Sequence, residues 1–424
     1  MNLLFHWRTA YAGLSRVRSW CLVGWTVGTI IPYLAIATAH PQEKGVPVDA
    51  EPFTASLVAV NSEEIQFRKE DGREQSVPVG ELVHWGTCRE PQRGPVVILR
   101  DGGLLTALTG WKLNADTISI ESDIWKAARI PRRLVRGVLL QVPGSAAERD
   151  AILVQMTTSP DKLDQCVLLD NDVVAGTIVS SMDDAIEMKV EARTVTIPRA
   201  DLRAVIFRNL LNRPRTPSSI WSVGFLTGDC LFVDVVLLNT EGGKLVTGAG
   251  LALAPWKPDT LLEEICFLRP PCARCVYLSD LDPTSYKHVP LLELAWPYHT
   301  DRNVGGGQLR HAGKVFHKGL GLHSMSSLSY ALDGQYSRFQ AEIGLDDVAA
   351  RRGSVICRAY VNSGSGWKLA FESAVIRGQQ PLVPVSVDVS GAQRISLIVD
   401  RADQGDEWDY VNWIDARLTV NFTE

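Results

Sequence analysis

Ring-bearing and charged side chains gather in the last third of the chain. Trp296, Asp301 and Arg302 lie within "AWPYHTDRN", whose proline and polar residues are typical of a loop. His323 follows the glycines of "KGLGLH", and glycine within a strand pattern marks a bend or a close approach. An aromatic ring offers an apolar face, and a charged side chain offers strong hydrogen bonds. Together they can bind a ligand that has both an apolar face and polar groups.

A second group with the same chemistry lies near the C-terminus. Asp409, Tyr410, Asn412 and Trp413 occur together in "EWDYVNWIDARL". Trp413 alternates with Val411, so it fits a buried strand position as well as an exposed ring. The segment predicts a strand end that carries both polar and aromatic side chains.

Several candidates also fit purely structural roles. His323 is compatible with a hydrogen-bonded histidine at a strand end. Arg302 is compatible with a surface pair beside Asp301, which would contribute little to stability. Asp346 and Asp347 follow "IGL" and can either hold a calcium ion with their carboxylate oxygens or cap a turn. Structural calcium is therefore left open, and no other cofactor is expected.

The chain carries no recognisable catalytic motif. It contains no G-x-S-x-G, no H-E-x-x-H and no glycine-rich phosphate loop followed by lysine. A glycosidase needs two positioned carboxylates in a cleft, whereas the acidic residues here are scattered over strand and turn patterns. A serine or cysteine triad stays open, because its members meet only in the fold. We expect a protein that is not an enzyme.

Cysteine usage gives little guidance. Eight cysteines are present, and removal of Cys21 with an N-terminal signal leaves an odd number, so at least one thiol of an exported protein is free. Cys272 and Cys275 form the CxxC of "PPCARC", but no second pair completes a structural zinc site. Local disulfides or plain thiols are expected, and metal binding or a redox role stays open.

Residues 1–39 are typical of a secretory signal. Basic residues, including Arg8 and Arg18, precede the apolar stretch "WCLVGWTVGTIIPYLAIATA", which ends in a small-x-small pattern. Cleavage is expected after Ala39. The apolar run has about 20 residues, enough to cross a bilayer, so an uncleaved N-terminal anchor is the alternative. Either way we expect the body of the protein outside the cytoplasm, in the periplasm, in the envelope or secreted.

Composition and charge narrow the class of partner. The 424 residues suffice for two or three domains, and a net charge of −5 provides no basic stripe for nucleic acid and no polybasic surface for anionic lipid. No nucleic-acid partner is expected, and no membrane partner unless the N-terminal segment is retained.

Residues 50–285 repeat a β-rich pattern about four times. Short strands of alternating polarity are separated by Asp, Gly and Asn turns, and related prolines recur at Pro78, Pro131 and Pro198. "IPRADLRAVIF" predicts a brief helical turn before the last strand of a unit. One such unit cannot bury its apolar face alone, so we predict a tandem of small curved β units; a propeller would need more blades. A scaffold or a protein-interaction surface is the expected role.

Residues 290–422 form a second all-β region after a junction rich in Pro, Asp and Gly. Segments of strand length, such as "SRFQAEIGL" and "AQRISLIVD", are separated by turn residues at intervals typical of an antiparallel sandwich. About eight strands would suit a jelly roll.

The residues of this region resemble a known family. "HKGLGLHSMSSLSYALDGQYSRFQAEIGLDD", "GSVICRAYVN", "SVDVSGAQRISLIVD" and "DYVNWIDARL" follow in order the pattern of the NPCBM family. The resemblance implies a galactose-binding-like jelly-roll β-sandwich of the kind appended to secreted bacterial glycosidases. It also implies that glycine in "KGLGLHS" clears space near a binding edge.

A carbohydrate is the ligand that this resemblance implies. The expected sugar-binding residues are Trp296, Asp301, Arg302, His323, Asp409, Tyr410 and Trp413. Many family members have Asp-His-Ala where this chain has Asp409-Tyr410-Val411, which puts direct sugar contact there in doubt. We expect an exported, non-catalytic protein that recognises a galactose-like sugar. The alternative is a structural or protein-interaction component of the cell envelope that does not bind sugar.

Overall fold

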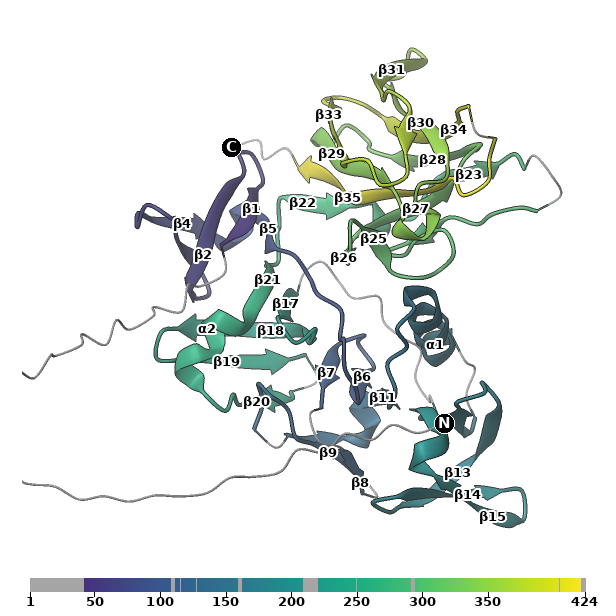
Figure 1. Cartoon of the computed structure of the whole chain (residues 1–424). Helices are drawn as coiled ribbons and strands as arrows, with labels where there is room; N and C mark the ends of the chain where they lie inside the picture. Colours follow the sequence, from purple (N-terminus) through teal and green to yellow (C-terminus); the bar gives the residue numbers. More distant parts are fainter. Residues whose placement is uncertain are drawn as a thin grey trace, which may run out of the picture. The chain divides into compact units, whose positions relative to one another are not determined.

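Two facing antiparallel sheets make up the C-terminal part of the chain (Figure 1). The computed structural model describes residues 42–107, 111–114, 116–126, 128–158, 162–208, 220–248, 250–290, 294–403 and 405–420. The signal or anchor expected at residues 1–39 lies outside these ranges. Within them, no helix has the length and apolar character needed to span a bilayer.

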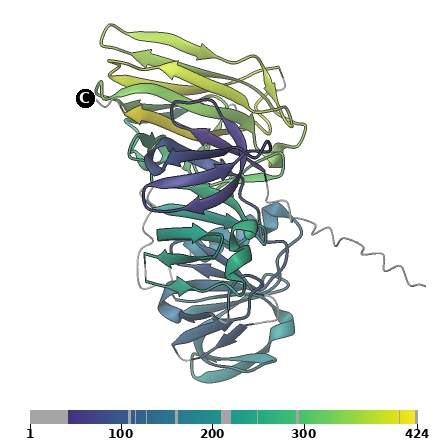
Figure 2. The same cartoon turned by 90° about the vertical axis from the view of Figure 1, so that its left-hand side faces the viewer.

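The sandwich consists of two main sheets and a short hairpin. One sheet has the order β24-β27-β35-β29-β33 with β22 added on β35, and the other has the order β23-β28-β34-β30-β31 with β32 added on β30. Figure 2 shows these strands, in green and yellow, running side by side. Their bounds are β22 (Cys275–Tyr277), β23 (Ser285–His288), β24 (His299–Thr300), β25 (Leu309–His311), β26 (Lys314–Phe316), β27 (Gly319–His323), β28 (Ser326–Ala331), β29 (Tyr336–Leu345), β30 (Ser354–Asn362), β31 (Trp367–Glu372), β32 (Ile376–Arg377), β33 (Val383–Asp388), β34 (Arg394–Arg401) and β35 (Tyr410–Val420).

Alternating side chains close the core between the two sheets. In β29, Phe339, Ala341 and Ile343 are buried, while the residues between them are partly exposed. Successive side chains of a strand point to opposite faces, so this alternation puts one face of β29 against the facing sheet. These residues join a single buried cluster that includes Trp413. The predicted all-β sandwich is confirmed.

The sandwich begins earlier than the sequence predicts. β22 pairs with β35, and β23 pairs with β28. Both strands precede residue 290, the expected start of the second region. The Pro- and Asp-rich composition of the junction concealed them, because each strand is short and lies between turn residues.

The N-terminal region consists of linked β units with two helices. β8, β9 and β10 form a separate three-stranded sheet, and the other strands before β22 join one hydrogen-bonded network of 18 strands. The bounds are β1 (Glu43–Pro47), β2 (Phe53–Val60), β3 (Glu64–Arg68), β4 (Glu74–Pro78), β5 (Leu82–Gly86), β6 (Val96–Leu99), β7 (Leu104–Thr106), β8 (Trp111–Leu113), β9 (Thr117–Ile120), β10 (Ala128–Pro131), β11 (Val135–Leu139), α1 (Ala146–Thr158), β12 (Asp164–Leu168), β13 (Val173–Ser181), β14 (Ala185–Val190), β15 (Arg193–Pro198), β16 (Leu202–Ile206), β17 (Trp221–Phe225), β18 (Cys230–Asn239), β19 (Gly242–Thr247), β20 (Ala252–Leu253), α2 (Leu261–Glu264) and β21 (Ile265–Arg269).

One succession of elements occurs around each of the prolines noted in the sequence. Pro78, Pro131 and Pro198 each end a strand, cap a short 3₁₀ helix and lead into the next strand. Proline suits this position because its fixed φ starts a helical turn without losing a needed N–H. The brief helical turn predicted from "IPRADLRAVIF" is present at residues 199–201.

Helix α1 was not anticipated from the sequence. Ile152 and Met156 lie one helical turn apart and are buried in a small cluster with Val96, Leu139 and Ile206. This stripe covers one side of β6, β11 and β16, which explains why the segment folds as a helix inside an otherwise β region.

Candidate functional site

Three of the expected ligand-binding side chains meet at one end of the sandwich. Trp296 precedes β24, His323 ends β27 and Tyr410 begins β35. His323 and Tyr410 lie opposite each other on neighbouring antiparallel strands. The indole of Trp296 stacks on the imidazole of His323, with ring centroids 4.9 Å apart and planes 3° from parallel. The ring of Tyr410 lies 5.4 Å from that of Trp296 and 5.8 Å from that of His323.

Two further rings complete this group, which we call the rim cluster: His288, Trp296, His323, Trp408 and Tyr410. His288 ends β23; its ring lies 5.7 Å from that of His323, edge to face. The backbone N–H of Trp296 donates to His288 Nδ1 at 3.2 Å, which fixes the loop against the strand end. The ring of Trp408 lies 5.7 Å from that of Tyr410.

Burial controls the charge of the two histidines. Burial lowers the pKa of His323 and of His288 below the usual value, and for His323 the neighbouring His288 adds to this effect. Both imidazoles are therefore neutral at pH 7, and each offers one donor and one acceptor nitrogen. Nδ1 of His323 is buried without a hydrogen-bond partner in the described part of the chain.

A cation lies at the edge of the rim cluster. The guanidinium of Arg352 lies 3.4 Å from the ring centroid of Trp408, a cation–π contact. The backbone of Trp408 has a φ of 65°, in the left-handed region. The sequence did not single out Arg352, since nothing in "ARRG" distinguishes it from a surface arginine.

Asp409 supports the rim cluster from inside the sandwich. Its carboxylate is fully buried, and Oδ1 accepts a hydrogen bond from the backbone N–H of Ser354 at 2.8 Å. Burial raises the pKa of Asp409 to about 6. Oδ2 has no hydrogen-bond partner among the described residues. The carboxylate thus joins β30 to the start of β35.

Comparison with known families gives this region a name. Residues 274–419 match the family model described as the NPCBM/NEW2 domain. This part of the chain is an NPCBM domain. The match begins at β22, in agreement with the strand pairing that places β22 and β23 in the sandwich.

Relatives of the NPCBM domain occur in larger proteins. One, named "Putative endo-alpha-N-acetylgalactosaminidase", is from Renibacterium salmoninarum and is 31% identical over 115 residues, which are 27% of this chain and 7% of that protein. The CBM51 of Clostridium perfringens GH95, solved in complex with methyl-galactose, is 25% identical with a TM-score of 0.31, over 34% of this chain and 99% of that one. The CBM51-2 and INT domains of Clostridium perfringens ZmpB, solved with GlcNAc, are 28% identical with a TM-score of 0.32, over 42% of this chain and 36% of that one.

Asp301 pairs with a buried lysine, and Arg302 with a backbone carbonyl. Asp301 Oδ2 accepts from Nζ of the buried Lys318 at 2.9 Å, and Oδ1 accepts from the backbone N–H of Gly319 at 3.2 Å. Asp280 is a second partner of Lys318, at 2.5 Å. Arg302 donates to the carbonyl of Gly306 at 3.3 Å. Asp301 therefore neutralises a buried ammonium in the NPCBM domain.

Trp413 belongs to the core of the NPCBM domain. Its side chain is fully buried between the sheets, with its ring 6.3 Å from that of Phe339. Of the two positions that the sequence allowed for Trp413, a buried strand position and an exposed ring, the structure shows the buried one. Asn412, which precedes Trp413 in β35, is also buried, and its side chain donates to Asp346 Oδ2 at 2.7 Å.

The glycines of "KGLGLH" make room for backbone. A Cβ on Gly321 would lie 2.4 Å from the carbonyl oxygen of Arg302 and 2.5 Å from the backbone nitrogen of Val304. Gly319 has a φ of 149°, and a Cβ there would lie 2.6 Å from the carbonyl oxygen of Trp413. The space that we expected near a binding edge is filled by residues 302–304, which these glycines allow to cross β27.

Asp346 and Asp347 hold backbone groups. Asp346 caps the turn that follows β29, with its side chain accepting from the N–H of Val348 at 3.1 Å. Asp347 accepts from the backbone N–H groups of Ala312 and Gly313 at 2.8 and 2.7 Å. Asp346 therefore caps its own turn and Asp347 holds the turn between β25 and β26, while the calcium alternative stays a prediction.

Proposed function

We propose that this protein is an exported, non-catalytic carbohydrate-binding protein, and that its rim cluster binds a galactose-like sugar. The observation that carries the proposal is the stacked pair of Trp296 and His323 beside Tyr410, at strand ends of an NPCBM domain. Domains of this family are carbohydrate-binding modules, which agrees with a role in recognition.

The side chains of the rim cluster match the two kinds of surface on a pyranose ring. The half-buried indole of Trp296 supplies an apolar face for the C–H face of the sugar. The half-buried, neutral His288 accepts from Trp296 at Nδ1, so its Nε2–H can donate to a hydroxyl group, while the buried His323 supports the indole from beneath. A galactose-like sugar has an axial hydroxyl beside an apolar patch, so one ring packed on the open face of the indole can direct that hydroxyl toward the half-buried His288.

A cleft beside Tyr410 gives room for more of a glycan. Its lining includes Asn303 and Tyr410 from the sandwich and Ala147 and Asp150 from α1. A second sugar unit would lie between the NPCBM domain and the helix, where carbonyl, amide and carboxylate groups can accept and donate hydrogen bonds.

Binding of the whole protein to a glycan array tests the proposal. We expect binding to galactosyl glycans, and roughly tenfold weaker binding for Trp296→Ala, because loss of a packed aromatic contact costs about 1.5 kcal/mol. His323→Ala should weaken binding to a similar degree. Trp367→Ala is the matched control: Trp367 is 46% exposed on β31, outside the rim cluster, and its loss should leave affinity unchanged.

The alternative function is a structural or protein-interaction role in the cell envelope. Exposed apolar side chains on the three successive strands β13, β14 and β15 and their turns favour it, among them Val179, Met182 and Val195, which are 60%, 42% and 39% exposed. No binding to any galactosyl, fucosyl or pectic glycan would favour this function over sugar recognition.

Export is the third part of the proposal and has its own measurement. Expression in a bacterial host followed by fractionation should recover the protein outside the cytoplasm. N-terminal sequencing should begin at His40 if the signal is cleaved after Ala39. Recovery in the cytoplasm would contradict export.

A further inference from the structure

Three potential metal ligands converge where the β units meet the NPCBM domain. Among the described residues, the ligand atoms of Cys88, Cys230 and His317 all lie within 4.8 Å of one another. Cys88 follows β5, Cys230 begins β18, and His317 follows β26 of the sandwich. The fold therefore brings together residues that are far apart in the sequence.

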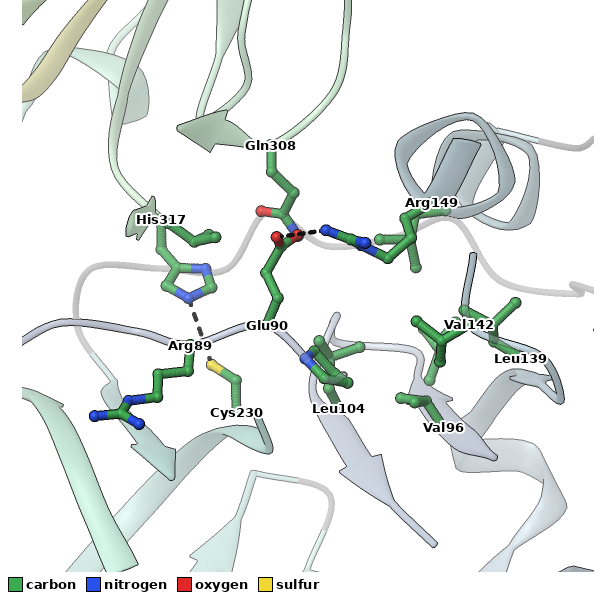
Figure 3. A pocket seen from close by; sticks show the side chains of 14 residues that line it. Arg89, Glu90, Val96, Leu104, Leu139, Val142, Arg149, Cys230, Gln308 and His317 are labelled. Atoms are coloured by element: carbon green, nitrogen blue, oxygen red, sulfur yellow. Dashed lines mark hydrogen bonds and ion pairs between the residues drawn. The ribbon is translucent and has the colours of Figure 1, made fainter. Parts of the chain in front are cut away.

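The geometry suits a tetrahedral metal. With metal–sulfur bonds of about 2.3 Å and a metal–nitrogen bond of about 2.0 Å, tetrahedral angles put two sulfurs about 3.8 Å apart and a sulfur and a nitrogen about 3.5 Å apart. Cys230 Sγ lies 3.7 Å from Nε2 of His317. Figure 3 shows this contact, with the imidazole of His317 directed at the sulfur of Cys230.

The surroundings fix these side chains in place. Cys88 and Cys230 are 4% and 3% exposed. The backbone of Cys88 forms a bridge with Val315, two residues before His317. The ring of His317 packs against Phe232 and Phe267, with centroids 6.3 and 6.1 Å away.

Room for the sulfur of Cys88 depends on a glycine. A Cβ on Gly224 would lie 3.2 Å from Cys88 Sγ. A pocket borders the group on the side of Cys230 and His317, and Gln308 is among the residues that line it (Figure 3). A fourth ligand, water or an external group, would reach a bound ion from this pocket.

We propose that Cys88, Cys230 and His317 bind a thiophilic metal ion, with Zn²⁺ as the best fit, and so clamp the β units to the NPCBM domain. Two thiolates and one imidazole are the donors that Zn²⁺ prefers, and hard ions such as Ca²⁺ prefer oxygen. On binding, the two thiols release their protons to solvent, and His317 donates the lone pair of Nε2 to the metal.

Metal content and cobalt spectroscopy of the full chain test the proposal. The reduced protein, stripped with a chelator, should take up one equivalent of Zn²⁺, measured by mass spectrometry of the metal. Co²⁺ in its place should produce thiolate-to-cobalt charge-transfer absorption. Cys88→Ser and Cys230→Ser should each lose the metal and the absorption. Zn²⁺ should raise the melting temperature of the wild type. His317→Gln, which removes the imidazole at a half-buried position, should abolish this rise.

A matched control tests whether the other cysteine pair, Cys272 and Cys275, binds the metal instead. The double variant Cys272→Ser/Cys275→Ser removes the CxxC and should keep both the metal and the absorption. Loss of metal in this variant, or retention of metal in Cys230→Ser, would overturn the proposal. So would a Cys88–Cys230 disulfide in the purified protein, detected by peptide mapping without reductant, or no uptake of metal by the reduced wild type.

Discussion

Asp409 links the charge of one residue to the stability of the NPCBM domain. Burial raises its pKa to about 6, whereas the unfolded chain titrates near the ordinary value of 3.8. Between these values the folded protein binds more protons than the unfolded one. The free energy of unfolding must therefore fall as the pH rises through this window. The contribution of Asp409 is fully present below its unfolded pKa and is lost above about 6.

Replacement of Asp409 by asparagine should stabilise the protein only at neutral and alkaline pH. Asn keeps the acceptor for the N–H of Ser354 but carries no charge to bury. At pH 8 we expect Asp409→Asn to raise the free energy of unfolding by up to about 3 kcal/mol, the equivalent of about two pKa units. At pH 4 the gain should nearly vanish. Urea unfolding at both pH values measures this, and an equal gain at both would contradict the role of the buried charge.

Asp301 should matter for stability and not for sugar affinity. Asp301→Asn leaves the buried ammonium of Lys318 with Asp280 as its remaining carboxylate partner. We expect a loss of about 1–3 kcal/mol in the free energy of unfolding. The affinity for a galactosyl glycan should stay within about twofold, because Asp301 is not part of the rim cluster. A large loss of affinity in a folded variant would restore Asp301 as a sugar contact.

Residue types alone predicted part of the rim cluster. Trp296, His323 and Tyr410 were expected from their loop-like surroundings, and the strand ends bring them together. His288 and Trp408 were missed, because their place in the cluster depends on β23 pairing with β28 and on the left-handed turn at Trp408. Such long-range pairing decides which rings meet, and it has no local sequence signal.

At the scale of elements, β27 contains a glycine because another segment of backbone packs directly against the strand. Gly321 lies in the middle of the strand, paired with Asn412 of β35, and the loop 302–304 crosses it at close range. A side chain there must displace backbone, which cannot move as a flexible side chain does.

Gly321→Ala should therefore destabilise the NPCBM domain strongly. A methyl group 2.4 Å from the carbonyl oxygen of Arg302 requires the loop to shift, and we expect a loss of at least about 2 kcal/mol in thermal or urea unfolding. Gly80→Ala is the matched control, because a Cβ at Gly80 meets no atom within 4 Å. A similar small effect in both variants would show that the loop yields easily.

Strands were easier to predict from the sequence than their boundaries or the helix. β29, β30, β33 and β34 were predicted because period-2 alternation marks a strand with one buried face. Helix α1 was missed, since its apolar residues Ile152, Leu153 and Val154 form a continuous run that shows no clear helical period. Tertiary packing on β6 and β11, and not local sequence, selects the helix there.

At the scale of the whole molecule, one arginine joins three distant segments. Arg310 of β25 makes two contacts with Asp150 of α1, at 2.5 and 2.7 Å, and one with Glu90, at 2.5 Å. The side chains of Arg310, Asp150 and Glu90 are only 6%, 11% and 16% exposed. Ion pairs so shielded from water are costly to break, because the partner charges stay buried.

Arg310→Met should uncouple the NPCBM domain from the β units. The substitution keeps apolar volume but leaves the buried carboxylate of Asp150 without its bidentate partner, which costs about 3–5 kcal/mol. We expect the wild type to unfold in one calorimetric transition and Arg310→Met to unfold in two, with the first at a lower temperature. Arg377→Met is the control: Arg377 pairs with Asp403 at the surface, where side chains are 36% and 60% exposed, and its loss should cost less than about 1 kcal/mol. A single, unshifted transition in Arg310→Met would mean that contacts such as that of His84 with Asp415 hold the two regions together without it.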